Sequence, residues 1–340
     1  MRRDRAAPRG ELETLVVESD ALQGHLLGDP TSRQVHVYLP AGHTPEQGLP
    51  LLVDLVGFTG SGLSHTNWRN FGENVPERAD RLIASGVMPP VVIAFPDCFT
   101  RLGGNQYINS VAMGRWEDFL IDEMLPAVER AFGCGGPGRR GVFGKSSGGY
   151  GTIVHAMRRA DTWSAAACHS GDMGFELMYL GNFPKTLRAL AEHGLSIERY
   201  VRAFDRADKN EPTDVAVMEH FAMAASYDPD PSSFLGIRLP VDLSTCEVID
   251  ERWTNWQAWD PVRMVERYAD NLASLKLLYL DCGVLDQCNL IYGARRYHRS
   301  LEALGVPHVY DEFDDNHTNI DYRMDRSLPQ MATALSGGAR

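Results

Sequence analysis

The sequence predicts an α/β fold built on a doubly wound, mostly parallel sheet of about eight strands. Short apolar runs bounded by turn residues recur along the 340-residue chain, as expected for strands that are buried on both faces of a sheet. Segments with a helical spacing of apolar residues separate most of these runs. Such alternation is typical of parallel sheets that carry helices on both faces.

The expected elements alternate along most of the chain. Strands are expected near residues 11 to 18, 34 to 40, 49 to 57, 90 to 96, 140 to 145, 163 to 169, 275 to 282 and 307 to 313. Helices are expected near residues 74 to 85, 116 to 132, 147 to 159, 261 to 273, 290 to 304 and 321 to 335. With 44% hydrophobic residues, a chain of this length can bury a large core.

The segment from 172 to 257 breaks the alternation. Three stretches in it have helical spacing, namely Pro184 to His193, Ile197 to Ala207 and Thr213 to Ala225, and proline breakers follow them. We therefore divide the chain into a first core part (1–171), a helical insertion (172–257) and a second core part (258–340). By analogy with related folds, the insertion is expected to form a cap.

The motif Gly144-Lys145-Ser146-Ser147-Gly148 follows an expected strand and precedes an expected helix. A serine with glycine at both i−2 and i+2 in this context is the pattern of a nucleophile elbow. The turn is so sharp that side chains at the flanking positions would collide with neighbouring backbone. Ser146 is therefore the candidate nucleophile. Ser147 is a poor alternative, because the pattern centred on it would need a glycine where Lys145 stands.

A second glycine-rich turn follows the expected strand at 49 to 57. It reads Gly57-Phe58-Thr59-Gly60-Ser61-Gly62. An oxyanion hole next to a nucleophile elbow uses the backbone N–H of the residue after the nucleophile and one N–H from such a loop. The backbone amides of Ser147 and Phe58 are therefore the candidate donors. The alternative is a flexible Gly/Ser loop without a catalytic role.

The other members of a catalytic triad should follow the serine, the acid first and then the histidine. The strand expected at 275 to 282 runs into Val284-Leu285-Asp286-Gln287, and the last expected strand is followed by a loop that holds His317. Of eleven histidines, His317 is the one directly after the last expected strand, where a loop can carry the imidazole back over the serine. The order Ser146, Asp286, His317 is the expected one.

Several of these segments together resemble one family, the esterase D-like branch of the α/β-hydrolases, which also holds feruloyl esterases, enterochelin esterases and mycolyltransferases. The resemblance rests on G-K-S-S-G-G at 144 to 149, on C-G-x-x-D at 282 to 286, on Gly104 to Tyr107 and on 114 to 130. It covers about 31 to 171 and 258 to 325. It implies an α/β-hydrolase fold and makes Asp286 the triad acid. Asp281 is the runner-up, because it too lies near the end of the expected strand.

The chain departs from the family pattern in two places. The family often has a histidine or aspartate just before the oxyanion-loop glycine, where this chain has Val56. It often has an aromatic residue after the catalytic histidine, where this chain has Thr318. Both changes are expected to affect substrate shape more than chemistry.

The insertion is rich in large, soft side chains. They are Met173, Phe175, Met178, Tyr179, Phe183, Met218, Phe221, Met223, Phe234, Trp253 and Trp256. Most of them are expected to pack the cap on the core. Together they indicate an apolar acyl or aryl pocket, and Phe221, Trp253 and Trp256 are the candidate pocket residues.

Composition excludes several classes of function. A formal net charge of −12 disfavours nucleic acid as a partner. No P-loop, dinucleotide fingerprint or zinc-ligand cluster is present, so neither a cofactor nor a metal is expected. The acidic run at 311 to 315 could bind a cation, although a solvated loop is the favoured interpretation. The expected partner is a small-molecule ester, and a homodimer remains open.

Localisation signals are also missing from the sequence. Met1 to Arg5 is basic, but no apolar region follows, and no stretch of about 18 apolar residues occurs anywhere. The expectation is a cytoplasmic protein without a membrane segment. The six cysteines suit reduced thiols in that compartment. A bridge between Cys282 and Cys288 is an alternative.

These observations together predict a serine ester hydrolase that works through an acyl-enzyme. An acyltransferase would use the same triad and pass the acyl group to an alcohol or a sugar. A serine peptidase and a non-catalytic binding module on a hydrolase scaffold are the remaining alternatives.

Overall fold

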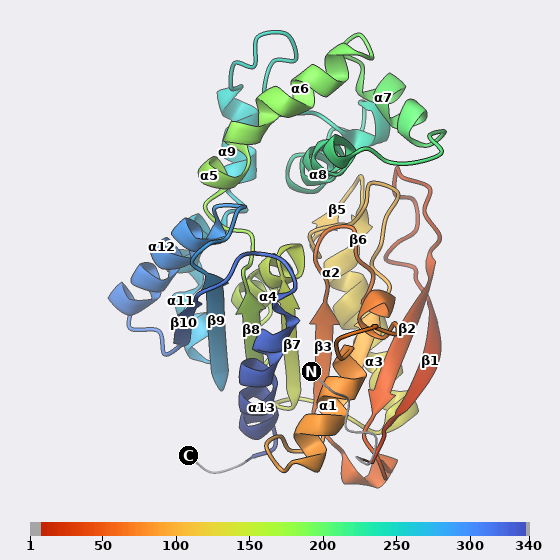
Figure 1. Cartoon of the computed structure of the whole chain (residues 1–340), viewed down its shortest axis with the longest axis vertical. Helices are drawn as coiled ribbons and strands as arrows, with labels where there is room; N and C mark the ends of the chain where they lie inside the picture. Colours follow the sequence, from red (N-terminus) through yellow and green to blue (C-terminus); the bar gives the residue numbers. More distant parts are fainter. Residues whose placement is uncertain (1–7, 338–340) are drawn as a thin grey trace.

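The computed structural model describes residues 8–337. The basic start from Met1 to Arg5 lies outside the described residues. An eight-stranded sheet runs through the molecule in the order β1-β2-β4-β3-β7-β8-β9-β10 (Figure 1). Its strands are β1 (Glu11–Glu18), β2 (Ser32–Leu39), β3 (Leu51–Leu55), β4 (Val92–Pro96), β7 (Arg140–Lys145), β8 (Ala165–His169), β9 (Leu277–Gly283) and β10 (Val309–Phe313). β1 and β2 pair antiparallel to their neighbours, and the other strands are parallel. The predicted α/β sheet is confirmed.

The central strands are apolar on both faces because helices cover both sides of the sheet. In β3, Leu51, Val53 and Leu55 belong to one apolar cluster and Leu52 to the other, as the alternation of side chains along a strand requires. Helices α1 (Val75–Ala84) and α13 (Met324–Leu335) cover the face of Leu52. Helices α3 (Leu125–Phe132), α4 (Ser147–Arg158) and α12 (Leu290–Ala303) cover the opposite face.

Three helical segments are more broken than the sequence predicts. The expected helix at 116 to 132 is α2 (Trp116–Asp118), a π-helical turn (Phe119–Met124) and α3. Pro126 lacks the N–H that an α-helix would bond to residue 122, which accounts for the wider turn. The helix expected at 261 to 273 consists of α10 (Pro261–Met264), a 3-10 turn and α11 (Ala269–Ala273). The last expected helix begins with a 3-10 turn (Ile320–Arg323) before α13.

The hairpin of β5 (Asn109–Ser110) and β6 (Gly114–Arg115) was not predicted, because two-residue strands carry no periodic signal.

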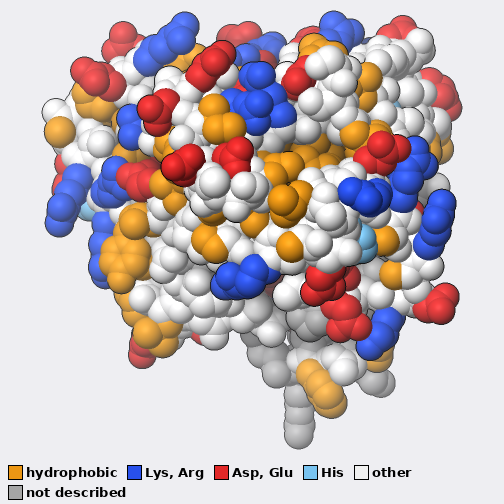
Figure 2. Space-filling model, turned by 90° about the horizontal axis from the view of Figure 1, so that it is seen from above, with side chains coloured by type: hydrophobic (Ala, Val, Ile, Leu, Met, Phe, Trp, Pro, Cys, Tyr) orange, Lys and Arg blue, Asp and Glu red, His pale blue; other side chains and the backbone are white. Residues whose placement is uncertain are grey.

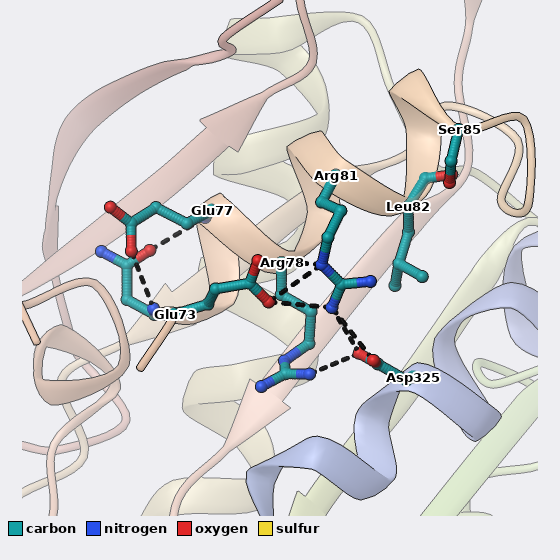
Figure 3. Close-up of polar contacts among 8 residues, drawn as sticks. Glu73, Glu77, Arg78, Arg81, Leu82, Ser85 and Asp325 are labelled. Atoms are coloured by element: carbon teal, nitrogen blue, oxygen red, sulfur yellow. Dashed lines mark hydrogen bonds and ion pairs between the residues drawn. The ribbon is translucent and has the colours of Figure 1, made fainter. Parts of the chain in front are cut away.

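An ion-pair cluster joins the two helices on the α1 and α13 face (Figure 3). Arg81 donates from Nε and Nη2 to both carboxylate oxygens of Glu73, with a shortest distance of 2.8 Å, and from Nη2 to Asp325 Oδ1 at 2.9 Å. Arg78, which is almost fully buried, pairs with the same Asp325. Asp325 on α13 therefore connects two arginines of α1, which fixes the two helices relative to each other.

The segment 172–257 forms a group of helices at one end of the molecule, above the sheet and beside the β5–β6 hairpin in Figure 1. They are α5 (Phe175–Met178), α6 (Phe183–Ala191), α7 (Ile197–Phe204), α8 (Pro212–Tyr227) and α9 (Asp250–Gln257). The three helices expected from the sequence match α6, α7 and α8 within a few residues. We call this group the cap, and its bounds at 172 and 257 as a separate unit stay a prediction.

His220 holds two cap helices together in its neutral form. Its ring lies 4.5 Å from the Phe183 ring, its Nδ1 lies 2.6 Å from Thr186 Oγ1, and only 1% of the residue is exposed. Burial lowers the pKa of His220 to about 3. Because an unfolded histidine has a pKa of about 6.5, the unfolded chain binds a proton more readily, and stability falls as the pH falls from 6.5 towards 3.

We therefore expect His220→Gln to weaken the acid sensitivity of the protein. Between pH 7 and 4.5 the unfolding free energy of the wild type should fall by about 2 to 3 kcal/mol more than that of His220→Gln, since each unit below the unfolded pKa costs about 1.4 kcal/mol. Denaturant unfolding at both pH values measures this difference. Parallel losses in the two proteins would show that another group causes the acid sensitivity.

Candidate active site

Ser146 lies in a strained turn between β7 and α4. Its backbone has φ 58° and ψ −127°, a conformation that costs a non-glycine residue about 1 to 3 kcal/mol and is held only when the surroundings impose it. The Ser146 N–H donates to the carbonyl oxygens of His169 and Ser170 at 3.0 and 3.1 Å. These bonds fix the turn against the end of β8, so that the hydroxyl is held at the start of α4.

The two flanking glycines are required by space. A Cβ on Gly148 would lie 1.8 Å from the carbonyl oxygen of Leu55, and a Cβ on Gly144 would lie 2.3 Å from the same oxygen. Real Cβ atoms do not approach backbone oxygens so closely. The end of β3 therefore lies directly against the elbow, which explains why the sequence has glycine on both sides of Ser146.

The structure brings Ser146, His317 and Asp286 into one hydrogen-bonded chain. His317 Nε2 lies 3.0 Å from Ser146 Oγ, and His317 Nδ1 lies 2.7 Å from Asp286 Oδ2. The Asp286 side chain is fully buried, and 13% of the His317 side chain is exposed. The other Asp286 oxygen accepts from the Cys288 N–H at 2.8 Å. This arrangement can deprotonate a hydroxyl and stabilise the imidazolium that results.

Asp281, the runner-up acid, has other partners. It lies inside β9, where His169 Nδ1 is 2.7 Å from Oδ1, Arg323 Nε donates to Oδ2 at 2.9 Å and the Tyr279 hydroxyl donates to Oδ2 at 3.0 Å. Burial raises the pKa of Asp281, but His169 and Arg323 outweigh it, so that the pKa lies below its ordinary value. Asp281 is therefore part of a buried ionic cluster under α13.

The two candidate oxyanion donors flank the serine. A Cβ on Gly57 would lie 3.2 Å from Ser146 Cβ, so the Phe58 loop passes directly beside the nucleophile. The loop is held by Tyr107, whose hydroxyl donates to Val56 O at 2.6 Å, and by the Thr59 N–H, which donates to Gly103 O at 2.7 Å. Within residues 8–337, neither the Phe58 nor the Ser147 amide donates to a protein acceptor. Their role as oxyanion donors stays a prediction.

A polar network that was not predicted from the sequence lies next to Ser147. The Ser147 hydroxyl and Gln106 Nε2 both lie 3.1 Å from Asp172 Oδ2, and Gln106 Nε2 also lies 2.7 Å from the Tyr227 hydroxyl. Burial raises the pKa of Asp172 to about 6. Because Tyr227 ends α8, the network connects the residue after the nucleophile to the cap. The available signal was the position of Asp172 just after an expected strand, at the same sheet edge as Ser146 and Asp286.

The six cysteines form no disulfide bridge, and several acidic residues near the site pair with other side chains. All six cysteines are free, so the alternative bridge between Cys282 and Cys288 is wrong. Among the described residues, Asp286, Cys288 and His317 have potential ligand atoms within 4.8 Å of one another, but Asp286 and His317 already bind each other. In the acidic run at 311 to 315, Asp311 pairs with Arg323 and Glu312 pairs with Arg295.

The three candidate pocket residues lie in the cap interior. Phe221 is fully buried and packs edge-on against Tyr200 of α7 at 5.7 Å between ring centroids. Trp253 lies 6.0 Å from Trp256, and Trp256 is fully buried against Tyr227. This burial favours packing for Phe221 and Trp256, and their contact with a substrate stays a prediction. Seen from the cap end, apolar side chains gather in the middle of the face between charged ones (Figure 2).

A family model described as "Putative esterase" matches residues 30–332. The chain belongs to this esterase family. The match spans both core parts and the whole cap, and it agrees with the resemblance seen in the motifs. A search of curated proteins gives no significant match. Within residues 8–337, no helix has the length and apolar character needed to cross a membrane.

Solved structures of esterases have the same fold. A ferulic acid esterase is 18% identical with a TM-score of 0.62, and the alignment covers 96% of this chain and 99% of that one. A ferulic acid esterase from Anaeromyces mucronatus, solved with ferulic acid, is 14% identical with a TM-score of 0.60, covering 98% and 95%. An S-formylglutathione hydrolase from Staphylococcus aureus is 15% identical with a TM-score of 0.54, covering 95% and 99%. The α/β-hydrolase fold predicted from the sequence is thereby confirmed.

Proposed function

We propose that this member of the esterase family is a serine hydrolase of small to medium carboxylic esters with an apolar acyl or aryl group. The observation that carries the proposal is the chain of hydrogen bonds from Ser146 through His317 to Asp286, with the serine on a strained elbow. Membership of the esterase family and the apolar composition of the cap support it.

In the proposed reaction, Ser146 Oγ attacks the ester carbonyl carbon while its proton passes to His317 Nε2. The negative charge that develops on the carbonyl oxygen is received by the Phe58 and Ser147 amides, a contribution on the order of 3 kcal/mol per donor in other enzymes. The C–O bond to the alcohol then breaks, and His317 returns the proton to the leaving oxygen. Water attacks the acyl-enzyme by the same steps and releases the acid.

The alternative function is acyl transfer, in which an alcohol replaces water in the second half of the reaction. The same triad serves both reactions. Solved structures with this fold include a ferulic acid esterase and an S-formylglutathione hydrolase, so aryl esters and thioesters belong among the substrates to be tested.

We expect the protein to hydrolyse p-nitrophenyl esters and an ester of an aromatic acid such as methyl ferulate, with one mole of free acid formed per mole of alcohol released. Titration of the acid alongside the absorbance of p-nitrophenol measures this ratio, with and without an added acceptor alcohol. A shortfall of acid that is matched by a new ester would identify an acyltransferase. An absence of turnover with every ester and thioester would contradict the proposed function.

A further inference from the structure

A pocket that the proposed reaction does not use lies between the cap and the second core part. Its volume is about 550 Å³, within the range of roughly 300 to 1,000 Å³ that is usual for small-molecule sites. Its walls come from the ends of α4 and α9, from α10 and from the 3-10 turn at 265–268. Three arginines and two aromatic residues line it, namely Arg158, Arg263, Arg267, Trp259 and Tyr268. We call it the arginine pocket.

The arginine pocket is separate from the catalytic centre. Helix α4 begins at Ser147, next to the nucleophile, and ends at Arg158. Because an α-helix rises about 1.5 Å per residue, about 16 Å along the helix axis separate these two positions. None of the triad residues and neither of the candidate oxyanion donors lines the pocket. A ligand held here would therefore lie away from the ester that Ser146 attacks.

Aromatic rings hold two of the guanidinium groups in place. Arg158 Cζ lies 5.3 Å from the centroid of the Trp259 ring. Arg267 Cζ lies at the same distance, 5.3 Å, from the centroid of the Tyr268 ring. Attraction to a ring face uses the charge of a guanidinium and not its N–H groups, so these donors stay available to an anion.

The protein neutralises the positive charge of the pocket only in part. Arg158 Nε donates to Glu117 at 3.0 Å, and Arg263 Nη2 lies 3.0 Å from the neutral side-chain amide of Gln257. Arg263 and Arg267 are exposed and form no ion pair within residues 8–337, and no aspartate or glutamate of those residues lines the pocket. Two positive charges thus remain in one pocket of a chain whose formal net charge is −12. Their mutual repulsion would be offset by a bound anion.

We propose that the arginine pocket binds a small organic phosphate monoester. A phosphate monoester carries close to two negative charges at neutral pH, which matches the two arginines without a carboxylate partner. Its oxygens can accept from several guanidinium N–H groups at once. The volume leaves room for an organic group beyond the phosphate, next to Trp259 and Tyr268. The proposal does not depend on the ester reaction, because this binding uses no residue of the triad.

Calorimetric titration with phenyl phosphate in a phosphate-free buffer tests the proposal. Benzoate has the ring with one negative charge, and inorganic phosphate has the charge without the ring. We expect one phenyl phosphate to bind per chain, at least about tenfold more tightly than either of the other two anions. Arg263→Gln and Arg267→Gln should each weaken its binding at least about tenfold, as the loss of a hydrogen-bonded charge would do.

Arg202→Gln is the matched control. Arg202 is an exposed cap arginine that also lies over a ring, with Cζ 5.6 Å from the centroid of Phe234. The substitution changes the net charge equally, and the affinity for phenyl phosphate should stay within about twofold of the wild type. Thermal unfolding shows whether each variant is folded. If the wild type binds no phenyl phosphate, or the control loses as much affinity as the pocket variants, the proposal is wrong.

The other anions and a blocked catalytic centre separate the remaining possibilities. Benzoate binding as tightly as phenyl phosphate would identify a carboxylate site, and equal binding of inorganic phosphate would identify free phosphate as the ligand; both results contradict the proposal. Protein whose Ser146 has reacted with a fluorophosphonate should bind phenyl phosphate with unchanged affinity, whereas lost binding would place the anion in the catalytic centre. If Ser146 does not react, the proposed function fails, and the arginine variants still decide this inference.

Discussion

Ser146→Ala should lower kcat for ester hydrolysis on the order of a millionfold, as the loss of the nucleophile does in other serine hydrolases. The reason is that the Ser146 hydroxyl lies 3.0 Å from His317 Nε2, where it can pass its proton to the imidazole as it forms the acyl-enzyme. Turnover of p-nitrophenyl butyrate measures the effect. The fold should remain, because alanine removes one oxygen from a turn whose glycines are unchanged.

Ser147→Ala is the matched control for this prediction. Its hydroxyl donates to Asp172, whereas its proposed contribution to catalysis is the backbone N–H, which alanine keeps. We expect Ser147→Ala to retain activity within about tenfold of the wild type, because the substitution removes only one hydrogen bond to a carboxylate. If Ser146→Ala keeps its activity and Ser147→Ala loses it, the nucleophile has been assigned to the wrong serine.

Asp286→Asn should lower kcat by about ten-thousandfold, because the amide holds His317 in the wrong tautomer, as in other triads. The geometry should survive, since Asn Oδ1 can still accept from the Cys288 N–H. Steady-state kinetics at saturating ester measure the loss. The fraction of correctly folded enzyme is counted separately by circular dichroism and thermal unfolding.

Asp281→Asn separates the two candidate acids. It breaks a buried cluster with His169 and Arg323, so the unfolding free energy should fall by about 3 to 5 kcal/mol, whereas kcat per folded molecule should stay within about tenfold. The pKa of Asp281 is lowered in the folded state, so its stabilisation is present above the unfolded pKa of about 3.9 and is lost as the pH falls below that value. A large loss of kcat in Asp281→Asn and a small one in Asp286→Asn would reverse the assignment of the acid.

The sheet was predictable from sequence because each central strand is an apolar run that helices bury on both faces. The elbow was predictable because its flanking positions have no room for a side chain, so the sequence must have glycine there. A Cβ added to Gly148 would lie 1.8 Å from Leu55 O. The β5–β6 hairpin was missed because strands of two residues have no measurable period. The π-helical turn at 119–124 was missed because the apolar spacing around it stays close to that of an α-helix.

Contacts between distant segments are what the sequence could not provide. Gln106 donates a hydrogen bond to Tyr227, which lies 121 positions further along the chain, and neither local sequence pattern indicates this contact. Asp281 and Asp286 were hard to separate because both stand near the end of one strand. Only the register decides, since Asp281 lies inside β9 opposite His169 of β8, whereas Asp286 lies in the following loop.

In the proposed mechanism, Ser146 forms the covalent bond to the acyl group. The most direct test is peptide mass spectrometry of the wild-type protein after reaction with a fluorophosphonate, with Ser146→Ala treated in parallel. We expect one adduct per chain, on the peptide that contains Ser146, and no adduct in Ser146→Ala. An adduct on another residue, or equal labelling of Ser146→Ala, would contradict it.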